Sequence, residues 1–435
     1  MDRFDIGLIG IAVTFLLVLF RMPIGVALAT TSFVGLWAMT NINAAFGMLK
    51  AVPYQFIANW SFSAIPMFLL MGYVASHAGL TSGLFRMMRV MLHRVPGGLA
   101  CSTVGACALF AAASGSSVAT AAGMGKIAIP EMRKAGYDAG LATGCVAAAG
   151  TLGSLIPPSV IMVIYGVFTQ APIGKLFLAG FLPGILTAVL YVVMIMARVK
   201  VTPSLAPSTK ETLAPGEFWG AIRESWPLPV LVLGVIGGIY AGVMTPTEAG
   251  AVGAALATLI ALVRGALSPR VMITALKETA LGTSALFIIA MGASMFTTFM
   301  GLAGLPSTIA RSILELGTEP LVLILVISLI YLVLGMFIDS LGIMLLTLPI
   351  LIPLLDGANI DLIWFGVLVV KLLEIGLITP PFGLNVFVIN SMMRGEVSLG
   401  VIFKGVLWFI AVELVVLGLL IGFPQISLWL PNQMN

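Results

Sequence analysis

The sequence predicts an all-α polytopic membrane protein of two structural repeats, each with a re-entrant helical hairpin and a broken helix. Three observations support this fold: the composition, the length of the apolar stretches, and a pattern of helix breaks that recurs at one interval. Of 435 residues, 60% are hydrophobic and 9% are charged, whereas an ordinary soluble domain has about 25% charged residues. This composition excludes a soluble globular protein.

The apolar stretches define the predicted membrane segments. A spanning helix needs about 20 apolar residues, so the chain holds about ten to thirteen membrane-embedded segments. The first stretch ends at Arg21 without a small-residue cleavage site, which predicts a retained helix and not a signal peptide. The clearest segments lie near residues 5–20, 22–40, 61–80, 97–114, 137–153, 158–171, 176–197, 227–244, 248–263, 279–300, 319–338, 361–378 and 405–423.

Basic residues predict the orientation, because Lys and Arg near helix ends mark the cytoplasmic side. Three basic clusters occur: Arg86, Arg89 and Arg94; Arg198, Lys200, Lys210 and Arg223; and Arg264, Arg270 and Lys277. The last two flank a pair of apolar segments that crosses out and back, so they lie on one side. The polar, Pro-rich residues 201–226 are therefore predicted to be a cytoplasmic linker between a first half, 1–200, and a second half, 227–435.

The repeat is visible in residues that break helices. Five residues of the first half have counterparts 223 residues later (339 − 116), without a gap. They are Ser116, Pro130, Gly153, Pro157 and Pro158, and their counterparts are Asp339, Pro353, Gly376, Pro380 and Pro381. Apolar segments interrupted by Gly and Pro at corresponding positions of two halves indicate a transporter binding site near the bilayer midplane.

One break in each half predicts a hairpin, near residues 97–131 and 319–355. The apolar arms after these breaks are residues 118–129 and 341–352. Each has about 12 residues and is roughly 18 Å long, which is too short to span the membrane. Each hairpin is therefore expected to enter and leave from the same side. Non-helical backbone at this depth is tolerated only inside protein or beside a cavity.

The second break in each half predicts a broken helix, near residues 137–171 and 361–393. Consecutive prolines remove amide donors and unwind a turn, which leaves carbonyl oxygens without partners. With hydroxyls at Ser154, Ser159 and Thr379, these carbonyls form the oxygen shell that Na⁺ takes, while half-helix N-termini face an anionic substrate. Alternatively, Pro and Gly only kink packed helices; their repetition at constant register favours an ion or substrate site.

Charged residues inside apolar segments are costly and often functional. Asp339 is either a Na⁺ ligand or the cap of an arm that begins at Ser340. Lys371 and Glu374, three residues apart, either pair with each other or act beside the Gly376 break.

Three further polar features have structural explanations. Thr245 or Thr247 caps a helix with Glu248 in its first turn. Residues 45–60 are too polar to span and are predicted to form an interfacial arm. Lys126 and Glu131 lie at a hairpin foot, where snorkelling to the interface explains them.

No enzyme is predicted. Gly125-Lys126 lacks the upstream Gly and the hydroxyl of a nucleotide-binding loop. His77 and His93 form no metal-ligand cluster, and one intramembrane Asp cannot supply an aspartyl protease pair.

Four motifs in order give the chain a resemblance to a known family. They are Ser114-Gly-Ser-Ser-Val-Ala-Thr120, the Gly-Thr-Leu-Gly-Ser-Leu-Ile-Pro-Pro-Ser run ending at Ser159, Thr245-Pro-Thr-Glu-Ala249, and Thr379-Pro-Pro-Phe-Gly-Leu-Asn385. With Ile65-Pro-Met-Phe-Leu-Leu-Met-Gly72, they resemble the large membrane subunit of tripartite ATP-independent periplasmic (TRAP) transporters over essentially the whole chain.

The resemblance implies inverted repeats, an elevator mechanism and Na⁺-coupled uptake across a bacterial inner membrane. It implies two protein partners, a small four-helix membrane subunit and a periplasmic substrate-binding protein, and no nucleic acid. The implied substrate is an organic acid: a C4-dicarboxylate, a keto acid, a sialic acid or similar.

The resemblance also implies site residues. One Na⁺ site would be framed by Ser114, Gly115, Gly153, Ser154 and Pro157, and the other by Gly335, Asp339, Gly376, Thr379 and Pro380. Substrate would lie between the hairpin tips, with contacts from Ser116, Ser117, Ser159 and Asn385.

Two alternatives remain. A self-sufficient Na⁺- or H⁺-coupled dicarboxylate or citrate carrier shares such repeats but needs no partners. A channel would show continuous polar faces on several helices, and this chain shows only local breaks.

Overall fold

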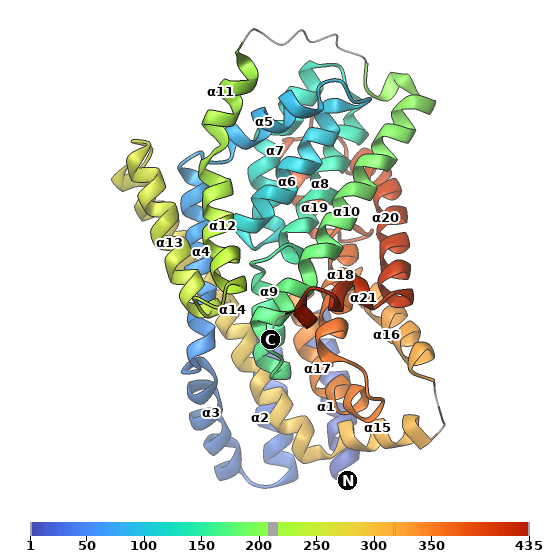
Figure 1. Ribbon diagram of the computed structural model, residues 1–435. Helices are drawn as coiled ribbons and strands as arrows, with labels where there is room; N and C mark the ends of the chain where they lie inside the picture. The colour runs from blue at the N-terminus through green and yellow to red at the C-terminus, as the bar shows by residue number, and fades with distance from the viewer. Residues whose placement is uncertain (1, 208–215, 316, 318, 434–435) are drawn as a thin grey trace.

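The computed structural model describes residues 2–207, 216–315, 317 and 319–433, and these residues form helices and connecting segments without a β-strand. The α-helices are α1 (Arg3–Leu19), α2 (Ile24–Met39), α3 (Ile42–Ile57), α4 (Ala64–His77), α5 (Ser82–Leu92), α6 (Gly98–Ser114), α7 (Ser117–Lys134), α8 (Ala139–Leu155), α9 (Val160–Thr169), α10 (Ile173–Val201), α11 (Glu217–Ser225), α12 (Pro227–Tyr240), α13 (Pro246–Val263), α14 (Pro269–Ala303), α15 (Leu305–Glu315), α16 (Pro320–Gly335), α17 (Ser340–Gly357), α18 (Leu362–Ile378), α19 (Leu384–Met392), α20 (Leu399–Gly422) and α21 (Gln425–Leu428). Figure 1 shows their arrangement.

The helix bounds follow the offset of 223 residues found in the sequence. Helices α5, α7 and α8 correspond end to end with α15, α17 and α18 at this offset. The exception is α14, one continuous helix of 35 residues where the first half has α3 and α4. These two are separated near Asn59 and bent by 58°. The segment 45–60, predicted as an interfacial arm, thus forms most of α3 and the bend.

In the described part of the chain, six helices, or up to eight if each bent pair is one span, are long and apolar enough to cross a membrane. This is fewer than the ten to thirteen embedded segments expected from the sequence. Several of those segments are short helices: α2, α6 and α16 have fewer than 18 residues, and α9 and α19 have 10 and 9.

The hairpin arms are longer than predicted. Helices α7 and α17 have 18 residues each and continue through Pro130 and Pro353, so the 12-residue arms were wrong. A proline removes one backbone amide donor. In α7 and α17 the backbone hydrogen bonds of the residues before and after the proline keep the helix continuous. Each of these helices is roughly 27 Å long. Their length is therefore no longer an argument that they cannot span the membrane.

In the described part of the predicted linker, residues 201–226, a short 3₁₀ helix spans Pro203–Leu205. Helix α11 occupies the C-terminal part of the linker, and residues 208–215 lie outside the described residues.

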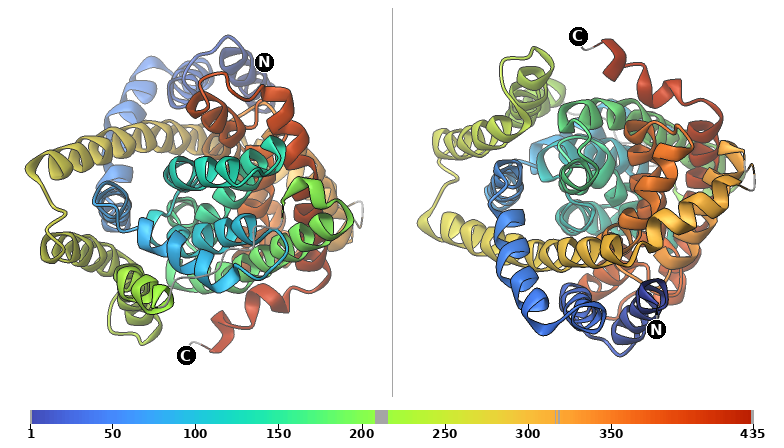
Figure 2. Two further views of the ribbon diagram at one scale, coloured as in Figure 1. Left: turned by 90° about the horizontal axis from the view of Figure 1, so that it is seen from above. Right: turned by 90° about the horizontal axis from the view of Figure 1, so that it is seen from below.

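Two helices, α8 and α18, form the centre of the protein. Every residue from Gly140 to Leu155 and from Phe365 to Ile378 is buried. Views along the long axis show the other helices packed around them (Figure 2). Helices α5, α6 and α7 lie at one end of the molecule, and α15 and α17 lie at the other (Figure 1).

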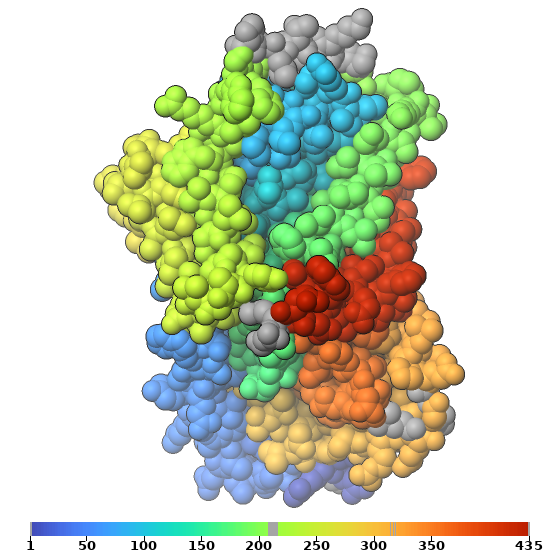
Figure 3. All heavy atoms as spheres, in the orientation of Figure 1, coloured from blue at the N-terminus to red at the C-terminus, as the bar shows by residue number. Residues whose placement is uncertain are grey.

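The outer surface is strongly apolar. Leu19, Leu233 and Leu281 are each more than 70% exposed, as expected for side chains that face lipid and not water. Helices α10, α12 and α21 lie on the face of the molecule that Figure 3 shows.

Candidate functional site

The tips of the two predicted hairpins have the same local geometry. Ser116 is the N-cap of α7, where its side chain accepts a hydrogen bond from the Ala119 amide (3.4 Å). Asp339, its repeat counterpart, is the N-cap of α17 and accepts from the Gly342 amide (3.1 Å). This confirms that Asp339 caps a helix beginning at Ser340. One carboxylate oxygen takes that bond, so capping does not use the whole carboxylate.

Both tips line one cavity of about 170 Å³. The first tip contributes Gly115, Ser116 and Ser117, and the second contributes Asp339 and Ser340. Ser154, from the first broken helix, lines the same space together with apolar side chains. Two segments more than 200 positions apart in the sequence therefore face each other across a single small chamber.

Close backbone contacts hold the first tip against the first broken helix. Gly115 has a φ of 61°, which favours glycine, and its carbonyl accepts from the Val160 amide (3.2 Å). A Cβ on Gly153 would lie 2.5 Å from Thr120 Oγ1 and 2.6 Å from the Ser116 carbonyl oxygen. Gly153 therefore allows α8 to approach the tip closely.

Hydroxyl groups are concentrated at this contact. Ser117 Oγ lies 2.5 Å from Ser154 Oγ and donates to the Thr151 carbonyl (3.1 Å). Ser114 Oγ lies 2.6 Å from Thr120 Oγ1. All five side chains are buried. Thr120 was part of the first sequence motif but was not predicted as a ligand, although its spacing of four residues from Ser116 places it one turn into α7.

The second tip meets the second broken helix through glycine. A Cβ on Gly376 would lie 2.8 Å from the Gly335 carbonyl oxygen. Thr379 Oγ1 donates to the Ile375 carbonyl (2.6 Å). Pro157 and Pro380 each begin a Pro-Pro pair between two half-helices, and both Pro-Pro bonds are cis.

Two predicted substrate contacts lie beside the cavity and do not line it. Ser159 is buried and caps α9, accepting from the Met162 amide (3.3 Å). Asn385 is buried on α19, and its Nδ2 donates to the Ala147 carbonyl of α8 (3.1 Å). In this structure both side chains hold the half-helices in place.

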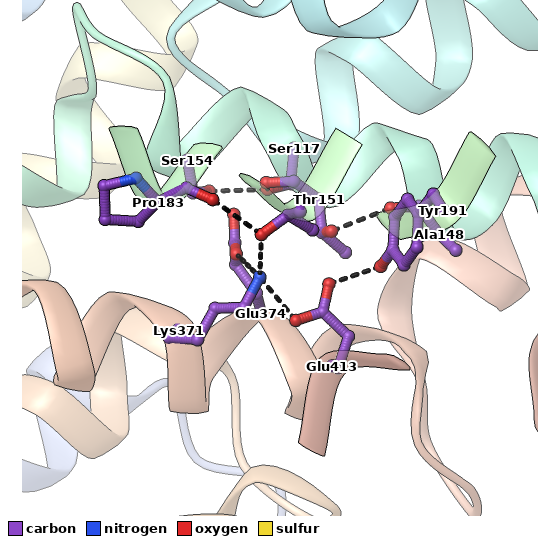
Figure 4. A network of polar contacts seen from close by, with 10 residues as sticks. Ser117, Ala148, Thr151, Ser154, Pro183, Tyr191, Lys371, Glu374 and Glu413 are labelled. Carbon is purple, nitrogen blue, oxygen red and sulfur yellow. Dashed lines mark hydrogen bonds and ion pairs between the residues drawn. The ribbon is translucent and has the colours of Figure 1, made fainter. Parts of the chain in front are cut away.

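A fully buried charge cluster lies next to the hydroxyl groups (Figure 4). Lys371 Nζ is 3.3 Å from Glu374 Oε2, pairs with Glu413 Oε2 and donates to Thr187 Oγ1 (2.9 Å). The Tyr191 hydroxyl donates to the other oxygen of Glu413. The predicted Lys371–Glu374 pair is thus confirmed, and it links α18 to α10 and α20.

Sequence reasoning missed Glu413. It is a lone carboxylate in the apolar helix α20, 42 positions from its partner Lys371 (413 − 371). A carboxylate deep inside a spanning segment is itself a signal of a functional or structural role, and that signal could have found Glu413.

The family profile described as "Tripartite ATP-independent periplasmic transporter, DctM component" matches residues 11–426. The chain belongs to the DctM component family. This confirms the resemblance inferred from the four motifs. The chain is therefore a multi-pass membrane permease of a TRAP transport system and not an enzyme.

Curated DctM-family relatives align over most of the chain. The C4-dicarboxylate TRAP transporter large permease protein DctM of Pseudomonas aeruginosa is 38% identical over 382 residues, covering 86% of this chain and 87% of the relative. The isethionate TRAP transporter permease protein DctMQ of Oleidesulfovibrio alaskensis is 36% identical, covering 91% of this chain and 62% of the relative. The fold is similar to that of the YdaH transporter of Alcanivorax borkumensis, with a TM-score of 0.58, 16% identity, and coverage of 89% and 90% of the two chains.

Proposed function

We propose that this chain is the transport subunit of a Na⁺-coupled, binding-protein-dependent importer of a small organic acid, such as a C4-dicarboxylate, in a bacterial inner membrane. The observation that carries the proposal is the cavity shared by the two tips, lined by Ser116, Ser154 and Asp339. At about 170 Å³ it is smaller than the pockets of roughly 300 Å³ or more that hold drug-sized ligands. A small acid suits it best.

The charge of the cavity supports Na⁺ coupling. Asp339 contributes a carboxylate, and no Lys or Arg is among the described residues that line the space. An organic anion placed beside Asp339 would be repelled in this poorly solvated setting. Bound Na⁺ relieves that repulsion, and the serine hydroxyls and unwound carbonyls supply the oxygen ligands found at such sites.

The arrangement of the tips supports an elevator mechanism with inverted repeats. Each tip packs tightly on its own broken helix, and the charge cluster ties α18 to α10 and α20. These elements form one rigid unit that carries the cavity and slides against the remaining helices. The greater length of the isethionate relative supports a second membrane component, the small four-helix subunit, beside a periplasmic binding protein.

Reconstituted uptake tests this function. Proteoliposomes holding this chain and the small membrane subunit are given a radiolabelled organic-acid panel, with and without the binding protein and a Na⁺ gradient. We expect uptake only when both Na⁺ and the binding protein are present. Uptake by this chain alone would establish the self-sufficient carrier instead.

Asp339→Asn separates the charge of the second tip from its capping role. Asn caps helices as well as Asp does, so the fold and assembly with the small subunit should be unchanged. We expect the Na⁺ concentration for half-maximal uptake to rise at least about fivefold, because about 1 kcal/mol of charge attraction is lost. Na⁺ titration of uptake measures this, with co-purification of the small subunit as control. An unaltered Na⁺ dependence would exclude Asp339 from the ion site.

A further inference from the structure

We propose that the cleft between α5 and the C-terminal part of α7 binds the phosphate headgroup of an anionic phospholipid. The cleft has a volume of about 450 Å³ and is separate from the cavity between the tips. Arg86 and Arg89 of α5 line one side, and Lys126 and Lys134 of α7 line the other. Glu131 is the one carboxylate among the described residues that line it.

Among the described residues, the ion pairs formed by the cations of the cleft do not include Lys126. Arg86 pairs with Glu224 (3.0 Å) and Arg89 with Glu217 (3.6 Å), both carboxylates of α11. Glu131 lies 3.9 Å from Arg89 and 3.6 Å from Lys134. Within residues 2–207 and 216–315, the four cations of the cleft thus lie beside three carboxylates, Glu131, Glu217 and Glu224.

The surplus cation matches the single negative charge of a phosphodiester. Lys126 makes no ion pair with any residue in the described ranges and is exposed at the cleft. A headgroup phosphate placed there would contact its ammonium and the free hydrogen-bonding positions of Lys134.

The apolar part of the cleft favours a lipid over a free anion. Phe85, Ile127 and Pro130 line the same space. Helix α5 buries Leu84, Phe85 and Val90 and also carries Arg86 and Arg89, so the cleft has apolar and basic side chains close together. The basic side chains would contact the phosphate of a phospholipid, and the apolar side chains would contact its glycerol backbone and acyl chains.

The repeat supplies a natural comparison. The equivalent cleft between α15 and α17 has about 530 Å³ and is lined by Pro353, the counterpart of Pro130. Among the described residues that line it, the charged ones are Arg311 and Glu315, one positive and one negative. Helices α5 and α15, whose side chains line the two clefts, lie at opposite ends of the molecule (Figure 1). The basic cleft is at the end that the positive-inside rule places in the cytoplasm, where the leaflet is anionic.

Native mass spectrometry of the detergent-purified chain tests the proposal, with phosphatidylglycerol, zwitterionic phosphatidylcholine and inorganic phosphate as probes. We expect phosphatidylglycerol to bind in preference to phosphatidylcholine. The Lys126→Gln/Lys134→Gln variant should bind it at least about tenfold more weakly, because each basic residue near an anionic lipid contributes about fivefold. Arg311→Gln in the comparison cleft should bind as the unaltered chain does.

Two results would overturn the lipid site: equal phosphatidylglycerol binding by the double variant and the unaltered chain, or displacement of the lipid by millimolar phosphate. Lys134 has a 76% exposed side chain, so folding should survive its change. Lys126→Gln alone is the second variant, and a monodisperse elution profile is required of both. Neither residue lies in the cavity of the proposed transport function, so this outcome is independent of the uptake experiment.

Discussion

Lys371→Met is expected to destabilise the protein more than any other single change considered. The ammonium of Lys371 lies between Glu374 and Glu413, and all three side chains are 0% exposed. Removing it leaves two buried carboxylates without a cation. Breaking a buried ion pair in this way costs about 3–5 kcal/mol, which lowers the unfolding midpoint of a chain of this length by about 3–6 °C.

Thermal unfolding of the detergent-purified chain, followed by intrinsic fluorescence, measures the effect of Lys371→Met. The matched control is Lys371→Met combined with Glu374→Gln and Glu413→Gln, which removes the uncompensated charge while keeping side-chain volume. We expect the triple variant to recover at least about half of the lost stability, because a neutral set of similar volume is often tolerated. A single variant as stable as the unaltered chain would contradict the importance of this cluster.

Gly153→Ala is expected to have the largest effect on ion binding. The added methyl group would lie 2.5 Å from Thr120 Oγ1 and 2.6 Å from the Ser116 carbonyl oxygen. The Ser116 backbone cannot move aside as easily as the end of a flexible side chain. Such overpacking costs about 1–3 kcal/mol. It would displace the first tip, which holds Ser117 against Ser154. At about tenfold per 1.4 kcal/mol, the Na⁺ concentration for half-maximal uptake should rise about tenfold.

Gly418→Ala is the matched control for Gly153→Ala, because a Cβ on Gly418 of α20 meets nothing within 4 Å. Na⁺-dependent uptake should be unaltered in this control. Equal Na⁺ dependence in the two variants would show that the contact between Gly153 and the first tip does not shape the site.

Much of the local structure could be predicted from the sequence. The repeat offset, the breaks and the start of α17 at Ser340 follow from residues that act locally. Proline removes a donor, glycine permits positive φ, and Ser or Asp caps the next helix. The same reasoning found Thr245 and Glu248, which form a capping box at the start of α13. It failed at Pro130 and Pro353, because a packed helix absorbs one missing bond.

Composition, the repeat offset of 223 residues and the four motifs are enough to identify a two-repeat membrane permease of the DctM family. Which distant residues contact one another could be seen only in the folded protein. The tertiary structure placed Ser116 and Asp339 across one cavity, moved Ser159 and Asn385 out of its lining, and paired Lys371 with Glu413. Such contacts depend on how helices pack against one another, and the side-chain pattern of a single helix does not specify its partner.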